Sequence, residues 1–210
     1  PAETEHIWGR PPGRMLEVGV GEGFSLDYFA SRGWEVVGMD FTDDGLQAFF
    51  PRLADKLMLG DAFELLDQAI ARGDQYDLVI CNNVLEHVID PVGLLTRLHA
   101  LMRPDGLVRI AVPNDNSWLQ AEIVRRGHAD PMFWVAAPDH LNYFNTDTLP
   151  KAMAATGWSV TDHLSEFPVD LFLLNPDTNY MRDRPLGRNC HFVRIAFEMG
   201  LWRERGVEGV

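Results

Sequence analysis

Apolar residues gather in five short runs over the first half of the chain, at 15–18, 34–39, 56–59, 76–80 and 106–112. Most of these runs are almost continuously apolar, which is typical of strands buried on both faces of a parallel sheet. Between them, apolar residues recur at helical spacing at 24–32, 62–72 and 91–102. Thr42 is a favourable N-cap for one more helix. We expect residues 104–106 to form a turn that ends the helix before them. This alternation predicts an α/β fold, a doubly wound and mainly parallel sheet with helices on both faces.

The regular alternation stops after Pro113. Residues 114–145 are rich in aromatic side chains, and an irregular segment of this length on a compact domain is typical of a lid. We expect a helix at 146–156, a strand at 159–167 and a final amphipathic helix at 190–205. A chain of 210 residues suits one domain. The predicted organisation is a core at 14–113, a substrate lid at 114–145 and a C-terminal part at 146–210.

Charge and composition narrow the choice of partners. The chain has 18 Lys and Arg against 31 Asp and Glu, a net charge of −13, and its longest basic run is Arg125-Arg126. We therefore do not expect nucleic acids or membrane surfaces as partners. A small molecule is the expected partner. No apolar run is long enough to span a membrane. The two cysteines, Cys81 and Cys190, are expected to be reduced thiols of a cytoplasmic protein.

The strongest chemical signal is a glycine-rich turn between the first run and the next helix. Gly19, Gly21 and Gly23 let the backbone turn tightly and let a ligand come close. The dinucleotide pattern G-x-G-x-x-G would need a glycine at Phe24, so the spacing suits a ligand without phosphates. Ligands of parallel sheets bind at the carboxyl ends of the strands, which is where this turn lies.

Polar residues also follow the next three runs. Asp40 could accept both hydroxyls of a ribose, or it could cap the following helix. Asp61 with Ala62 could contact the edge of an adenine, and the alternative is again a helix cap. Asn82 and Asn83 place polar groups beside the glycine turn.

Taken together and in this order, the four segments resemble the class I S-adenosylmethionine-dependent methyltransferases. The resemblance covers residues 14–167 and is closest to the small-molecule branch, which includes ubiquinone-biosynthesis O-methyltransferases and enzymes of sugar and secondary-metabolite pathways. It rests on residues 76–79, 84–88, 90–91, 101–106, 112–114 and 140–144. The resemblance implies a Rossmann-like fold, S-adenosylmethionine as cofactor, S-adenosylhomocysteine as product and a small-molecule acceptor.

The resemblance also implies roles for individual residues of the cofactor pocket. Glu17, Gly19, Gly21 and Gly23 would shape the pocket for the methionine and ribose parts, and Asp40 would bind the ribose diol. Phe41, Asp61 and Ala62 would contact the adenine. Asn82, Asn83 and Val84 would line the site near the sulfonium.

Methyl transfer needs a nucleophile in line with the methyl group and a base that removes its proton. The candidate bases are His140 in the lid, His87 and Tyr143. Oxygen is the expected acceptor atom, while nitrogen and carbon stay open. Trp118, Phe133 and Trp134 could line a substrate wall or simply pack the lid.

A metal ion is not expected. Some ubiquinone-type relatives are thought to bind a divalent ion through a Glu-x-x-Glu-His pattern, and here the first carboxylate is replaced by Asn83, ahead of Glu86 and His87. The segment after the fourth run also lacks the Pro-Pro-aromatic pattern of base-modifying enzymes. A nicotinamide-dependent oxidoreductase and a non-catalytic S-adenosylmethionine-binding protein are the alternatives, and a homodimer stays open.

Overall fold

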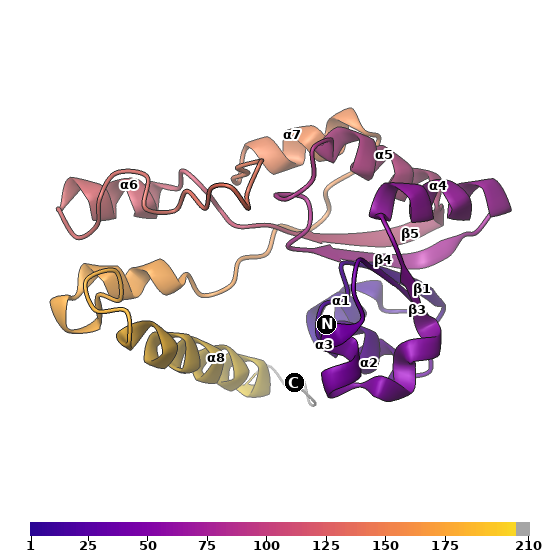
Figure 1. Ribbon diagram of the computed structural model, residues 1–210, viewed down its shortest axis with the longest axis horizontal. Helices are drawn as coiled ribbons and strands as arrows, with labels where there is room; N and C mark the ends of the chain where they lie inside the picture. Colours follow the sequence, from indigo (N-terminus) through magenta and orange to yellow (C-terminus); the bar gives the residue numbers. More distant parts are fainter. Residues whose placement is uncertain (205–210) are drawn as a thin grey trace.

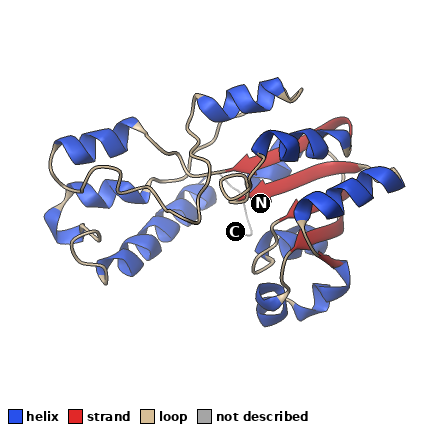
Figure 2. Cartoon of the chain, turned by 45° about the horizontal axis from the view of Figure 1, so that its top comes forward, coloured by secondary structure: helices blue, strands red, loops and turns tan. Residues whose placement is uncertain are grey.

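A five-stranded parallel sheet forms the core of the molecule (Figures 1 and 2). The computed structural model describes the backbone of residues 1–204. The sheet has the order β3-β2-β1-β4-β5, so the chain reverses its direction of travel across the sheet after β3. The predicted α/β fold is confirmed. The strands are β1 (Arg14–Val18), β2 (Glu35–Asp40), β3 (Leu57–Leu59), β4 (Tyr76–Asn82) and β5 (Met102–Ala111).

Helices cover both faces of this sheet because its strands are apolar on both sides (Figure 1). Neighbouring residues of β1 point in opposite directions: Leu16 packs with α4 (Ala62–Arg72), α5 (Pro91–Ala100) and α7 (Thr148–Ala155). Met15 packs on the other face, against α2 (Phe24–Ser31) and α3 (Asp44–Phe49). The short helix α1 (Ala2–Trp8) and the 3-10 turn η1 (Pro51–Lys56) complete that second layer.

Local capping signals set the two ends of α4 and the start of α5. The Asp61 side chain accepts hydrogen bonds from the backbone of Phe63 and Glu64 at the start of α4, and Gly73 ends that helix with φ 73°. Helix α5 begins at Pro91, and Asp90 accepts from the backbone of Gly93.

Beyond the carboxyl end of β5 the chain builds a separate lobe, seen on the left of Figure 1. The lobe contains α6 (Trp118–Arg125), the 3-10 turns η2 (Val169–Leu174) and η3 (Pro176–Thr178), and α8 (Leu186–Glu204). Buried Asn179 joins its two halves by donating to the carbonyl of His128 at 2.7 Å. The segment expected to be a lid is therefore one half of this lobe, and the C-terminal part is the other.

Two predictions about local structure are wrong. Residues 159–167 form no strand but an extended connection from the core to the lobe, with Val160 and Leu164 about half exposed. A strand was expected here, yet none of the described strands pairs with this segment. Residues 104–106 were expected to form a turn, but they belong to β5. The pairing of β5 with β4 shifts its register in this region, and Asp105 has φ 60°.

Two helix starts also differ from the prediction. Asp43, rather than Thr42, is the N-cap of α3, although the Thr42 hydroxyl accepts from the backbone of Asp44. The last helix begins at Leu186, four residues before the expected position.

None of the helices in the described part of the chain is both long and apolar enough to cross a membrane. Cys81 and Cys190 are free thiols, and both are buried.

Replacing Leu94 by alanine tests how much the packing of α5 contributes. Leu94 is fully buried, so Leu94→Ala should lower the free energy of unfolding by about 2–5 kcal/mol through lost burial and the cavity left behind. Val92, on the same helix, is 50% exposed, and Val92→Ala should change it by less than about 0.5 kcal/mol. Urea unfolding of both variants measures the difference, and equal losses would contradict this packing.

Candidate active site

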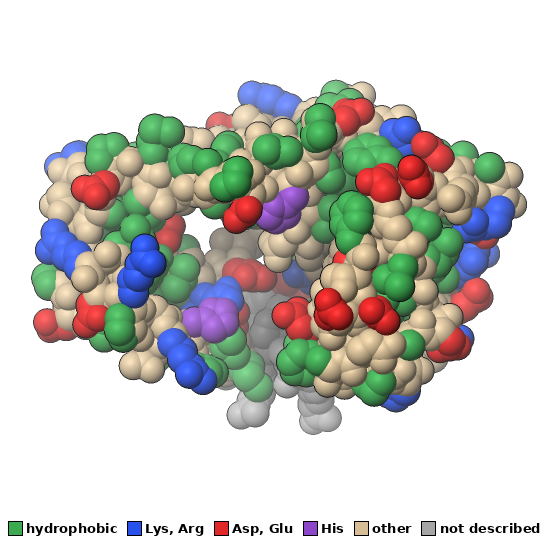
Figure 3. Space-filling model, in the orientation of Figure 1, with side chains coloured by type: hydrophobic (Ala, Val, Ile, Leu, Met, Phe, Trp, Pro, Cys, Tyr) green, Lys and Arg blue, Asp and Glu red, His purple; other side chains and the backbone are tan. Residues whose placement is uncertain are grey.

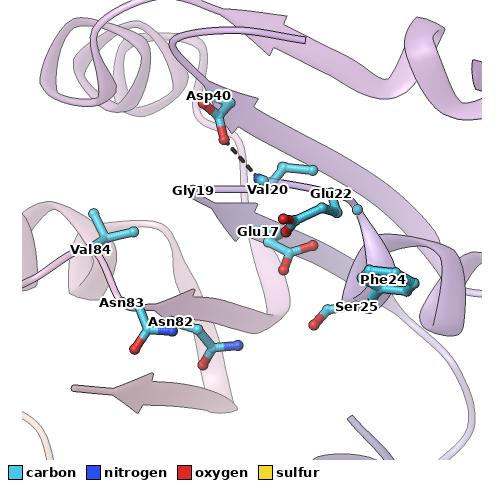
Figure 4. A pocket seen from close by; sticks show the side chains of 12 residues that line it. Glu17, Gly19, Val20, Glu22, Phe24, Ser25, Asp40, Asn82, Asn83 and Val84 are labelled. Carbon is cyan, nitrogen blue, oxygen red and sulfur yellow. Dashed lines mark hydrogen bonds between the residues drawn. The ribbon is translucent and has the colours of Figure 1, made fainter. Parts of the chain in front are cut away.

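A cavity of about 390 Å³ opens at the carboxyl ends of β1, β2 and β4, where the strand order reverses (Figure 4). Eight of the residues predicted for the cofactor pocket meet here. Phe41, Asp61 and Ala62 are not among the lining residues, and the Phe41 ring is 72% exposed. The cavity is lined by Glu17, Gly19, Val20, Gly21, Glu22, Gly23, Phe24, Ser25, Asp40, Asn82, Asn83 and Val84.

The glycine turn forms the floor of this cavity and needs its glycines. Gly19 has φ 77°, and a Cβ there would clash with the Val84 side chain. Gly45 in α3 is a residue that sequence reasoning missed. A Cβ on Gly45 would lie 2.5 Å from the carbonyl oxygen of Gly21, so α3 can support the turn only with a glycine at this position.

Asp40, the last residue of β2, ties the turn to the neighbouring strand. Its Oδ2 accepts a hydrogen bond from the Gly21 backbone N–H at 2.9 Å, and its Oδ1 accepts from the Thr42 N–H at 3.3 Å. A carboxylate has about four acceptor sites, so each oxygen keeps one free. Asp40 can therefore hold the turn and also accept two hydroxyls from a ligand (Figure 4).

Glu17 in β1 is buried, and burial raises its pKa to about 8. Hydrogen bonds from Ser25 and from the Leu26 backbone oppose this shift without cancelling it. The Oε2 atom of Glu17 and the Oδ1 atom of Asn82 are buried and have no hydrogen-bond partner. These two unpartnered oxygen atoms suit a ligand that presents N–H donors or a positive charge.

Asp61 uses its Oδ1 atom to cap α4, at 2.9 Å from the Phe63 nitrogen. This is the capping role that the sequence left open. Its contact with an adenine edge, together with those of Phe41 and Ala62, stays a prediction.

A second group of polar side chains lies where the turn after β4 meets the lid. Atoms of Glu86, His87 and His140 that can bind a metal ion all lie within 4.8 Å of one another. The His87 and His140 rings pack edge to face with their centroids 4.8 Å apart. Tyr143, the third predicted base, lies farther away, with its ring 6.3 Å from that of His140.

Backbone hydrogen bonds hold the lid against this turn. The N–H groups of Leu141 and Asn142 donate to the carbonyl of Glu86 at 2.8 and 3.0 Å. The Asn142 amide also donates to the carbonyls of Leu85 and Val88. His140 is therefore positioned by the core as well as by the lid.

Asp115 is a residue that the sequence did not single out. Its side chain is buried beside the second group, and burial together with the nearby charge of Glu86 raises its pKa to about 6, although His140 opposes the shift. Its backbone N–H donates to Phe144 at 2.7 Å, which joins the two ends of the lid. Only this tertiary contact, and no sequence motif, marks the residue.

The aromatic residues expected to form a substrate wall separate into two environments. Phe133 and Trp134 pack edge to face and are half-buried, whereas Trp118 is 78% exposed. The space-filling view shows an open hollow between core and lobe, with a histidine at its rim (Figure 3).

Known proteins similar to this chain are methyltransferases. Residues 3–163 match the family described as a methyltransferase domain. The ubiquinone biosynthesis O-methyltransferase of Salmonella paratyphi A is 30% identical over 193 residues, which cover 85% of this chain and 77% of the relative. That of Rhodopseudomonas palustris strain BisB5 is also 30% identical, covering 80% and 69%.

Solved structures show the same fold. A SAM-dependent methyltransferase from Archaeoglobus fulgidus matches with a TM-score of 0.58 at 17% identity, covering 89% of this chain and 83% of that one. The 1,6-didemethyltoxoflavin-N1-methyltransferase of Burkholderia thailandensis, with bound S-adenosylhomocysteine, has a TM-score of 0.53 at 22% identity, covering 74% and 64%.

The raised pKa of Glu17 predicts how stability changes with pH. The folded protein keeps the Glu17 proton up to about pH 8, whereas the unfolded chain releases it near the ordinary value of 4.5. The folded state therefore binds more protons between these values, and this residue lowers stability as the pH rises. Relative to the unmodified protein, Glu17→Gln should gain about 1–3 kcal/mol in the free energy of unfolding between pH 5 and pH 8.

Urea unfolding at the two pH values measures this gain. Glu22→Gln is the matched control, because Glu22 lines the same cavity but is exposed. A gain that is the same at both pH values would show that Glu17 is ionised in the folded protein.

Proposed function

Since the chain belongs to the class I S-adenosylmethionine-dependent methyltransferases, we propose that it methylates an oxygen atom of a small molecule, with a histidine as general base. The chain is an enzyme of this family. The observation that carries the finer proposal is the position of His140. It lies beside Glu86 and His87 in the turn that follows β4, and the first residues of this turn line the cofactor cavity.

The cavity suits the parts of S-adenosylmethionine that carry donors and charge. We assign its amino group to Glu17 and its ribose diol to Asp40, because both carboxylates have free acceptor sites there. Asn82, Asn83 and Val84 line the side toward the lid, where the reacting methyl group belongs. Gly19, Gly21 and Gly23 let the backbone approach the ligand, and Phe41, Asp61 and Ala62 complete the pocket at the adenine.

When bound, S-adenosylmethionine supplies an activated methyl group on a positively charged sulfur. The chain has to hold the acceptor hydroxyl in line and remove its proton as the new carbon–oxygen bond forms. His140 is the proposed base, because it lies at the junction of core and lid. His87 is the second candidate. Its Nδ1 atom is hydrogen-bonded to the Asp139 carbonyl at 2.8 Å, so its Nε2 atom can accept a proton from the acceptor.

Oxygen is proposed as the acceptor atom because the similar curated enzymes are O-methyltransferases. Nitrogen comes second, since the N-methyltransferase with a related structure is only 22% identical. We propose that the acceptor binds in the hollow between core and lobe. Phe133 and Trp134 lie in the same lid segment as His140 and pack against each other. The oxidoreductase considered from the sequence alone has no support, because the family is one of methyltransferases.

Asp40→Ala tests the cofactor pocket. The unmodified chain should bind S-adenosylmethionine and S-adenosylhomocysteine with micromolar affinity, and Asp40→Ala should weaken both at least about tenfold, since it removes the diol acceptor and the bond to Gly21. Isothermal titration measures this. Asp43→Ala, a carboxylate outside the cavity, is the control. Binding of NADH alone would refute the pocket assignment.

His140→Ala tests the base. The rate of methyl transfer should fall about 10²–10⁴-fold while cofactor binding is unchanged, because a general base contributes to the rate and not to cofactor affinity. S-adenosylhomocysteine formation, followed over a panel of phenols and other hydroxylated acceptors, gives the rate. His163→Ala changes an exposed histidine of the connection to the lobe and should have no effect. A His140→Ala variant with full activity would refute the proposed base.

A further inference from the structure

A second cavity, of about 550 Å³, opens beside the amino end of β2, at the edge of the sheet that β3 forms. It is a consequence of the shortness of β3, which pairs with β2 only from Gly38 onward. In the described sheet, residues 35–37 of β2 pair with β1 and have no partner in β3. The chain enters β3 through the 3-10 turn η1 and not through a longer strand, so this part of β2 keeps an open edge.

The lining of this second cavity is mostly apolar. Trp34, Val36 and Leu53 line it, and each of these residues is at most 5% exposed. Val37 and Met58 add half-buried side chains to the lining. A cavity of this size with apolar walls and few polar groups is typical of sites for small molecules.

The second cavity is separate from the cofactor cavity. No residue that lines one of them also lines the other. Asp40, at the cofactor cavity, comes five residues after Glu35 in β2, which corresponds to about 16 Å along the strand. A molecule bound at the amino end of β2 therefore leaves the cofactor cavity open.

Trp34 carries a hydrogen-bond donor that the protein does not use. Its Nε1 atom is buried and has no hydrogen-bond partner among the described residues. The ring packs against apolar neighbours, with centroid distances of 5.4 Å to Phe29 and 5.6 Å to Trp8. An indole nitrogen can only donate, and a buried donor left unpaired destabilises the folded chain. An oxygen atom of a bound molecule would supply the missing acceptor.

The charged residues of the second cavity already have partners. Lys56 Nζ lies 2.8 Å from the carboxylate of Asp55, and Glu35 lies 3.0 Å from Arg14 Nε. A charged ligand would lose its hydration here without finding an unpaired opposite charge. This arrangement favours a neutral ligand.

We propose that the second cavity binds a neutral, mainly apolar small molecule that carries a carbonyl oxygen. The oxygen accepts a hydrogen bond from the Nε1–H group of Trp34, and the apolar part of the molecule packs against Val36, Leu53 and Met58. The sequence did not indicate this site, because Trp34 belongs to an apolar run and the cavity arises only where β3 stops short of the end of β2. The site does not depend on which reaction the chain catalyses.

Nuclear magnetic resonance of the ¹⁵N-labelled full chain tests the site with acetophenone as the probe. The indole N–H signal of Trp34, identified by its loss in Trp34→Phe, should move saturably to higher frequency, with a Kd of about 1–10 mM, as is typical of a ligand this small. α-Methylstyrene has the same shape but carries a CH₂ group in place of the oxygen, and it should cause no shift in that direction. The signal of Trp118, which is 78% exposed, should stay unchanged.

Two variants separate the apolar contact from the hydrogen bond. Ala30→Leu adds apolar atoms to the lining of the cavity and should weaken both probes at least about tenfold. Ala71→Leu changes an exposed alanine of α4 and should bind both as the unmodified chain does. Trp34→Phe keeps an aromatic ring without the donor. It should weaken acetophenone about tenfold and α-methylstyrene less than about twofold, measured on the backbone signals of Val36 and Met58.

A Trp34 signal that does not respond to acetophenone up to about 10 mM would overturn the site, and so would full binding by Ala30→Leu. Unchanged affinity of Trp34→Phe for acetophenone would overturn the hydrogen bond and with it the class of ligand. Displacement of acetophenone by saturating S-adenosylhomocysteine would place the probe in the cofactor cavity and overturn the second site. Thermal unfolding identifies a variant that fails to fold, and Trp34→Phe decides the matter if Ala30→Leu is lost.

Discussion

Burial of the parallel sheet on both faces is the constraint on which the rest of the structure depends. Leu16 and Met15 are neighbours in β1 and both are fully buried, one under α4 and α5 and the other under α2 and α3. A sheet covered in this way has no free face, so a ligand can reach it only at the ends of its strands. All five strands run parallel, and the cavity lies at the carboxyl ends of β1, β2 and β4, where the turns after β1 and β4 and the first residues of α2 complete its lining.

The site at the carboxyl ends of the strands contains buried carboxyl groups that are not fully paired within the protein. Glu17 has a pKa of about 8 and Asp115 of about 6, in both cases chiefly because burial disfavours the charged form. Buried groups of this kind reduce the stability of the folded chain above the pH at which they would ionise in water. Such a cost is typical of positions kept for binding, where the ligand brings the missing donors.

One short segment connects the two halves of the site. Asn82, Asn83 and Val84 line the cofactor cavity, and Glu86 and His87 follow within a few residues at the contact with the lid. Because the Glu86 carbonyl accepts two backbone bonds from the lid, a shift of this segment would move both sites together. The C-terminal half of the lobe is reached from the core through the extended connection at 159–167.

The sequence by itself determined the sheet, the order of its helices and the glycine turn with Asp40, because each depends on signals within a few residues: unbroken apolar runs, caps and glycines. The prediction of a strand at 159–167 was wrong, because none of the described strands pairs with this segment. Only the tertiary structure decided that His140 meets Glu86 and His87, that Asp115 is buried beside them, and that Gly45 supports the glycine turn. The reason is that these contacts join segments far apart along the chain, and the physical signal for them is an unpartnered buried atom or a close approach, which exists only after folding.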